Sequence, residues 1–150
     1  MSKIVLLDAS PLGMVTNPRS SPENEECKNW LALLAYSGFK IVIPEIADYE
    51  VRRELLRASK TAGIARLDAL KEMLQYAPLT TPVMLKAAEF WATARNAGRQ
   101  SADDSSVDAD MILAAQAAAF NNERDQAVMA TTNIRHLALF ATARIWRHIQ

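Results

Sequence analysis

The sequence predicts an α/β protein: a three-layer α/β/α sandwich with a short, mostly parallel central sheet. Short apolar runs of strand length alternate with longer segments whose apolar residues recur at helical spacing. This alternation is typical of parallel sheets covered by helices on both faces. The chain has 150 residues, half of them hydrophobic, with only 4 Gly and 6 Pro. That length supports one continuous core, so we expect a single domain over residues 1–150.

Composition and charge argue against several other classes of protein. No apolar run approaches the roughly 18 residues that a membrane span needs, and Asp8 interrupts the N-terminal run too early for a secretory signal. Cys27 is the only cysteine, so no internal disulfide is possible, and we expect a cytoplasmic protein. Lys plus Arg and Asp plus Glu number 17 each, so net charge gives no indication of nucleic-acid binding.

The first elements follow from local residue types. Residues 3–7 are apolar and β-branched and predict a strand. Residues 11–22 contain three prolines, a glycine and two serines, and this composition predicts a loop. Apolar residues at helical spacing predict a helix over residues 23–37, and Gly38 suits its end.

The middle of the chain repeats the alternation of strand and helix. Residues 40–43 predict a second strand, and Pro44 suits the first turn of a helix that runs to about Ser59. Another amphipathic helix is predicted over residues 64–74, followed by a short edge strand within residues 75–79.

The last third adds two helices and two strands. A helix is predicted over residues 81–97 with Gly98 at its end, and a polar, acidic loop over 99–107 follows it. The remaining elements are a helix, a strand, one or two helical turns and a last short strand, over residues 108–121, 127–131, 133–140 and 144–146.

Acidic and amide side chains lie where these strands end or where helices begin. Asp8 directly follows the first strand, and Asn133 comes shortly after the strand 127–131. Glu50 and Asp110 lie within the first turns of helices. Because ligands of parallel sheets gather at the carboxyl ends of the strands, all four side chains can meet at one edge. Clustered carboxylates repel one another unless a hard cation neutralises them, so this pattern indicates a Mg²⁺ or Mn²⁺ site.

Structural roles for the same residues stay open at this stage. Asp8 and Asn133 are both suited to capping a helix, and Glu50 to an exposed helix face beside Arg53. Ser10 has no His-bearing motif around it, so the sequence gives little support to nucleophilic catalysis.

Four segments, in chain order, carry a resemblance to one family. They are VLLDAS at 5–10, IVIPEIADYEV at 41–51, Gly98-Arg99 followed by DMILAAQA at 110–117, and ATTN at 130–133. Together they resemble the PIN-domain nucleases, the family that includes the VapC-type toxins, and they extend over nearly the whole chain. The family's acidic positions fall on Asp8, Glu50 and Asp110, and its closing Thr-x-Asn or Thr-x-Asp segment ends at Asn133.

The chain departs from the family pattern at three places. Pro44 stands where relatives often have Ser or Thr, and Asn133 offers an oxygen without a charge. Asp108 and Asp110 form a pair in which either could face a metal ion. Residues two apart on a helix point about 200° away from each other, so the two acids are not expected to serve equally. Asp110 fits the family register and is preferred.

The resemblance implies a Mg²⁺- or Mn²⁺-dependent ribonuclease. A divalent cation neutralises charge on the phosphate oxygens and lowers the pKa of a bound water, and three carboxylates suffice to hold Mg²⁺. Asp8, Glu50 and Asp110 would be the metal ligands and, with Asn133, the catalytic residues. Further residues are expected in supporting roles: Ser10, Asp104, Asp108 and Thr131 around the ligands, and Arg52, Arg53 and Arg99 on RNA phosphates.

The resemblance also implies partners. Relatives often act as toxins held in check by a small antitoxin, and often form homodimers. The competing interpretation is a catalytically idle PIN-like module that binds RNA or a protein. The intact set Asp8, Glu50 and Asp110 argues against this alternative.

Overall fold

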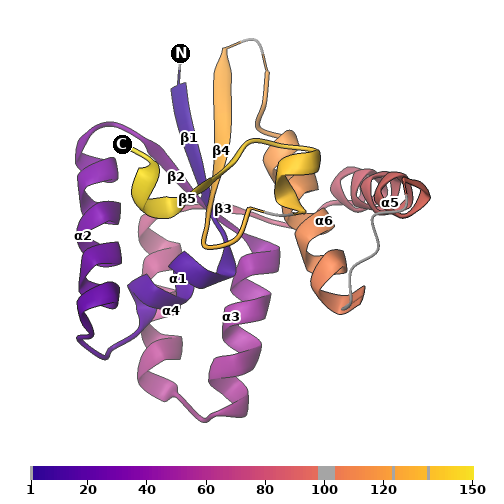
Figure 1. The fold of residues 1–150 in the computed structure, drawn as a ribbon. Coiled ribbons are helices and arrows are strands. Elements are labelled where there is room, and N and C mark those ends of the chain that lie inside the picture. Colours follow the sequence, from indigo (N-terminus) through magenta and orange to yellow (C-terminus); the bar gives the residue numbers. More distant parts are fainter. Residues whose placement is uncertain (1, 98–103, 123, 135) are drawn as a thin grey trace.

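The computed structural model contains a five-stranded sheet whose described strand pairs are all parallel (Figure 1). It describes residues 2–97, 104–122, 124–134 and 136–150. The strands are β1 (Ser2–Leu7), β2 (Lys40–Pro44), β3 (Gln75–Ala77), β4 (Asp125–Thr131) and β5 (Ala143–Ile145). Their spatial order is β3-β2-β1-β4-β5, so β1 is central and β2 and β4 are its neighbours. This arrangement confirms the predicted fold class.

Helices cover both faces of the sheet and complete the three layers. They are α1 (Ala9–Thr16), α2 (Pro22–Tyr36), α3 (Glu45–Arg57), α4 (Thr61–Met73), α5 (Thr81–Asn96) and α6 (Asp104–Ala118), with short 3-10 helices η1 (Leu137–Leu139) and η2 (Trp146–His148). One face packs mainly against α1, α2 and α4, and the other against α6 and η1. Helix α5 lies outside α6 (Figure 1).

The central strand is apolar on both faces because both are covered. Val5 and Leu7 join the core beneath α1 and α2, and Ile4 and Leu6 join the core beneath α6. All four side chains are buried, as expected for a parallel strand between two helical layers. None of the helices formed by the described residues is long and apolar enough to span a membrane.

The predicted loop over residues 11–22 is wrong in its first half, because α1 occupies Ala9–Thr16. Pro11 is the third residue of this helix, where a backbone N–H has no helical acceptor in any case. Leu12 is fully buried in the core, and the Thr16 hydroxyl donates to the Leu12 carbonyl oxygen at 2.9 Å. Burial of one helix face therefore outweighs the loop-like composition.

Helix α6 begins at Asp104, four residues before its predicted start, so the predicted loop over 99–107 is also too long. Asp and Ser are common at helix starts as well as in loops, and the buried Val107 ties the first turn to the core. The one or two helical turns predicted over 133–140 are a single 3-10 turn, η1, among the described residues, and the other predicted helices and strands are present with small shifts at their ends. Gly38, which ends α2, has a φ of +88°, a conformation that favours glycine.

Candidate active site

Asp8 lies at the junction of β1 and α1, at the carboxyl edge of the sheet. Its Oδ1 accepts a hydrogen bond from the Ala9 N–H at 2.7 Å and thereby caps α1. Its Oδ2 accepts from the hydroxyl of Thr131, the last residue of β4, also at 2.7 Å. Burial raises the pKa of Asp8, and these two hydrogen bonds oppose the rise. Asp8 therefore caps α1 and also presents its carboxylate at the carboxyl edge of the sheet.

Glu50 reaches the same edge from α3. Helix α3 starts directly after β2 and packs against both α1 and α6 around the lower ends of β1 and β4 (Figure 1). Glu50 is partly buried. Burial raises the pKa of Glu50, the negative charge of Asp8 raises it further, and the positive charge of Arg53 opposes both effects.

Asp110 approaches from α6 on the other side of the edge and is also partly buried. Burial, followed by the charges of Asp8 and Glu50, raises its pKa to about 7. Three carboxylates from three separate segments therefore act on one another electrostatically. Burial is the larger cause and this repulsion adds to it, so all three carboxyl groups have raised pKa values when no cation compensates them.

The chemistry of these donors fits a hard divalent cation. Within the described part of the chain, no three His, Cys, Asp or Glu side chains converge to metal-binding distances. The fit therefore rests on the donor set itself. All three carboxylates have raised pKa values, and their mutual repulsion is relieved when a cation binds among them. Oxygen is the ligand atom that Mg²⁺ and Mn²⁺ prefer.

Asp108 lies away from this group. It is exposed and lines a small apolar hollow between α5 and α6, together with Met84, Trp91 and Met111. This separation follows from the two-residue spacing, which turns the two aspartates toward different neighbours. Asp104 is the first residue of α6, and its side chain lies outside the described residues, as does the whole of Arg99.

The residues that follow β4 form a hydrogen-bonded turn beside Asp8. The Asn133 N–H donates to the Thr131 hydroxyl oxygen at 3.1 Å, while that hydroxyl donates to Asp8. Thr131 is fully buried and Asn133 is exposed at the rim. By this hydrogen bond Thr131 fixes the orientation of the Asp8 carboxylate. Ser10, in the first turn of α1, is exposed.

The two arginines on α3 have different surroundings. Arg53 acts on Glu50 and lies over the Tyr49 ring, 5.2 Å from its centroid. Arg52 instead pairs with Asp48 at 3.0 Å and with Asp68 of α4 at 2.7 Å. These contacts occupy the Arg52 guanidinium within the protein and argue against its predicted contact with RNA.

A second acidic centre on α3 was not predicted from the sequence. Asp48 is 5% exposed, and its Oδ2 meets the Lys71 ammonium at 3.0 Å and the Tyr76 hydroxyl at 2.9 Å. Burial alone would raise the pKa of Asp48, but these hydrogen bonds and the charges of Arg52 and Lys71 hold it below its usual range. Two of its partners, Lys71 and Tyr76, come from α4 and β3, so no local pattern in the sequence indicates these two contacts.

The class of protein follows from comparison with a family model. The chain matches the model of the PIN domain over residues 5–136, which covers Asp8, Glu50, Asp110 and Asn133. The chain therefore belongs to the PIN-domain family. PIN domains are nucleases that generally use divalent metal ions.

Solved structures with the same fold come from VapBC assemblies. VapBC2 from Rickettsia felis, bound to a DNA fragment from their promoter, gives a TM-score of 0.72 at 19% identity over 94% of this chain and 97% of that one. VapBC-1 from nontypeable Haemophilus influenzae gives 0.64 at 16%, covering 96% and 98%. DNA-bound VapBC from Salmonella typhimurium gives 0.66 at 15%, covering 97% and 99%. No curated protein matches the chain.

Proposed function

We propose that this chain is a Mg²⁺- or Mn²⁺-dependent ribonuclease that hydrolyses RNA phosphodiester bonds. The observation that carries the proposal is the mutual electrostatic effect of Asp8, Glu50 and Asp110 at the carboxyl edge of the sheet. When bound, the cation would neutralise charge on the phosphate and lower the pKa of the attacking water. Membership of the PIN family supports nuclease activity in general, and RNA is the substrate that we propose.

The chain's own groups have separate roles in this proposal. Asp8, Glu50 and Asp110 would hold the cation. The Thr131 hydroxyl keeps one Asp8 oxygen in place by its 2.7 Å hydrogen bond, which limits rotation of the carboxylate. Asn133 at the rim would orient water or substrate through its amide. Arg53, beside Glu50, would hold an RNA phosphate, and we propose the same for Arg99.

We further propose that the nuclease is the toxin of a toxin–antitoxin pair in the cytoplasm. The resemblance of the fold to chains from VapBC assemblies supports this role. The implied partners are an antitoxin protein and a second copy of the chain. Co-expression with the product of a neighbouring short gene, followed by copurification, tests the antitoxin. If the chain is toxic to the cells and purifies without the product of the neighbouring gene, it would be an orphan nuclease.

The substitution Asp8→Asn tests the site directly. Asn caps a helix about as well as Asp, and the Thr131 hydroxyl can accept from the new amide instead of donating, so the fold should survive. RNA cleavage in Mn²⁺ should fall by about 100-fold or more, because one charged ligand is lost. The Mn²⁺-dependent rise in melting temperature should shrink in parallel.

The same experiment separates the proposal from the idle-module alternative. The wild-type protein should cleave total RNA in Mn²⁺ and not in EDTA, with cleavage followed on denaturing gels. Wild-type protein that binds RNA without metal-dependent cleavage would favour the binding module. Undiminished cleavage by Asp8→Asn would place the active site elsewhere.

A further inference from the structure

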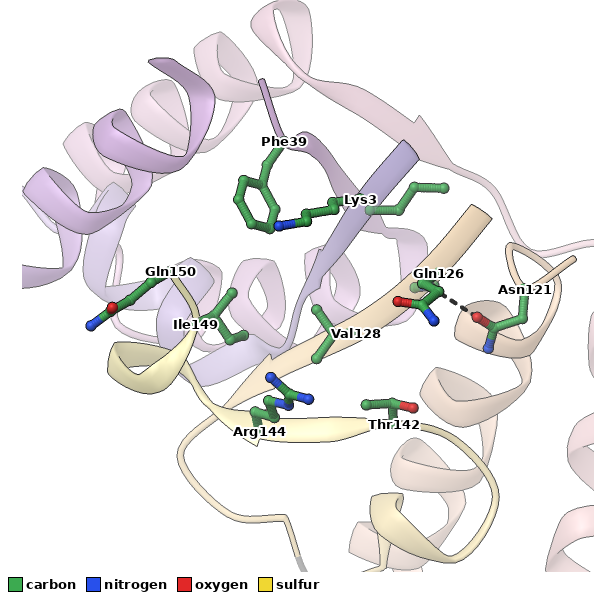
Figure 2. Close-up of a pocket in the computed structure, with 11 residues that line it drawn as sticks. Lys3, Phe39, Asn121, Gln126, Val128, Thr142, Arg144, Ile149 and Gln150 are labelled. Carbon is green, nitrogen blue, oxygen red and sulfur yellow. Dashed lines mark hydrogen bonds between the residues drawn. The ribbon is translucent and has the colours of Figure 1, made fainter. Parts of the chain in front are cut away.

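A second hollow lies beside β5, on the sheet face that carries α1 and α2 (Figure 2). Its volume is about 550 Å³, and its walls include Lys3, Phe39, Gln126, Arg144 and Ile149. We call it the basic pocket. Along an extended strand, at about 3.3 Å per residue, the Cα atoms of Lys3 and Asp8 lie roughly 16 Å apart. The basic pocket is therefore separate from the proposed metal site.

All the charged side chains that line the basic pocket are positive. Lys3 and Arg144 are its two cations, and none of the side chains that line it is acidic. Neither cation takes part in any of the ion pairs found among the described residues, although Arg147, Arg52 and Lys71 all do. The Lys3 ammonium lies 5.3 Å from the centroid of the Phe39 ring. Two cations that share a concave surface lined by no acidic side chain attract an anion from solution.

The remaining walls suit the uncharged part of a ligand. Phe39, Val128 and Ile149 provide apolar surface. Side-chain amides are present on one side of it, at Gln126 and Asn121, and on the opposite side at Gln150 (Figure 2). Asn121 is fixed in place, because its Oδ1 accepts from the Ala127 N–H at 2.9 Å. Apolar surface with a few amide groups is the usual lining of sites for planar, hydrogen-bonding molecules such as nucleobases.

We propose that the basic pocket binds a nucleoside monophosphate, with Lys3 and Arg144 on the phosphate and the base against Phe39 and the amides. The hollow is within the range of roughly 300–1,000 Å³ that small-molecule sites occupy. The ligand is either a free nucleotide or the phosphorylated terminal nucleotide of an RNA chain. Both present the same phosphate and base. This binding does not depend on the acidic site, and no reaction occurs in the pocket.

Calorimetric titration with adenosine 5′-monophosphate tests the proposal. EDTA in the buffer removes any contribution of metal-bound phosphate at the acidic edge. We expect saturable binding of one nucleotide per chain, and loss of about tenfold or more of the affinity in Lys3→Gln/Arg144→Gln, because both charge-assisted contacts are removed. A matched control, Arg66→Gln/Lys86→Gln, removes the same charges from α4 and α5, and should bind like wild type.

Further titrations identify the source of the ligand. The three probes are the free nucleotide, a short RNA with a 5′-phosphate, and the same RNA without that phosphate. If the phosphorylated RNA binds more tightly than both of the others, the ligand is an RNA end. A free nucleotide that binds as tightly as the phosphorylated RNA identifies the nucleotide itself. No saturable binding of either probe would overturn the proposal. Equal loss in the control variant, or inorganic phosphate binding as tightly as the nucleotide, would overturn it as well. Amide chemical shifts should move at Lys3, Gln126 and Arg144, and not at Asp8.

Discussion

Helix α3 carries two acids two residues apart whose surroundings are opposite. Asp48 is buried among Lys71, Tyr76 and Arg52, and its pKa is held below the usual range. Glu50 faces Asp8 instead, and its pKa is raised. A turn of about 200° between positions i and i+2 of a helix places the two carboxylates in different surroundings.

The contrast separates a carboxylate that is paired within the fold from one that we propose binds a cation. Burial raises the pKa of both carboxylates. At Asp48 the hydrogen bonds and the cations Arg52 and Lys71 outweigh this effect, whereas at Glu50 the charge of Arg53 only opposes it. At the acidic edge, Asp8, Glu50 and Asp110 leave negative charge that the described residues offset only through Arg53 and hydrogen bonds to Asp8. Groups with such uncompensated, raised pKa values are typical of functional sites.

The largest expected effect is on cleavage, and it distinguishes the two aspartates of α6. Asp110→Asn should lower metal-dependent RNA cleavage by about 100-fold or more, because it removes a proposed ligand. Asp108→Asn is the matched control. Its side chain lines the hollow between α5 and α6, so cleavage should stay close to wild type. Rates of cleavage of one labelled RNA in Mn²⁺ measure both variants. The reverse ranking would move the site to Asp108.

The next largest effect is on stability, and it tests the contrast between Asp48 and Glu50 on α3. Asp48→Ala leaves Lys71, Tyr76 and Arg52 without their acceptor. It should lower the free energy of unfolding by roughly 2–3 kcal/mol, less than for a fully buried pair, since Lys71 and Arg52 still reach solvent. Glu50→Gln, measured beside it by urea unfolding in EDTA, should be neutral or stabilising because one repelling charge is gone. Equal destabilisation by both variants would remove the distinction between the two acids.

The smallest expected effect is a pH dependence of stability in the metal-free protein. The pKa of Asp110 is about 7 in the folded chain and has an ordinary value of 3.8. Between these values the folded state binds more protons than the unfolded state, so the free energy of unfolding falls as pH rises from about 4 to about 7. Asp48, with a lowered pKa, has the opposite sign and loses its contribution only in stronger acid.

Comparison of wild type with Asp110→Asn isolates this contribution. In EDTA the variant should be more stable at pH 8 by on the order of 1–2 kcal/mol, after allowance for screening by solvent. At pH 5 the two proteins should differ much less, because Asp110 is largely protonated there. Urea unfolding at both pH values provides the measurement. A difference that does not change with pH would mean that Asp110 ionises normally in the folded chain.

Much of the fold was predictable from periodicity. The apolar run 3–7 identified β1, and Gly38 correctly marked the end of α2. Helix α1 was missed because Pro11 and Gly13 are typical of loops. Its formation depends on Asp8 as a cap and on burial of Leu12 in a core that distant segments build. Local composition contains no information about that burial.

For the candidate site, local sequence patterns were enough to identify the acids, their order, and the strands and helices that carry them. Which charges act on one another depends on the tertiary structure. The fold brings Asp110 within electrostatic range of Asp8 and Glu50, leaves Asp108 beside α5, and pairs Arg52 with Asp48 and Asp68. The physical reason is that periodicity reports which face of an element is buried, whereas an ion pair depends on distances between elements that are remote in sequence.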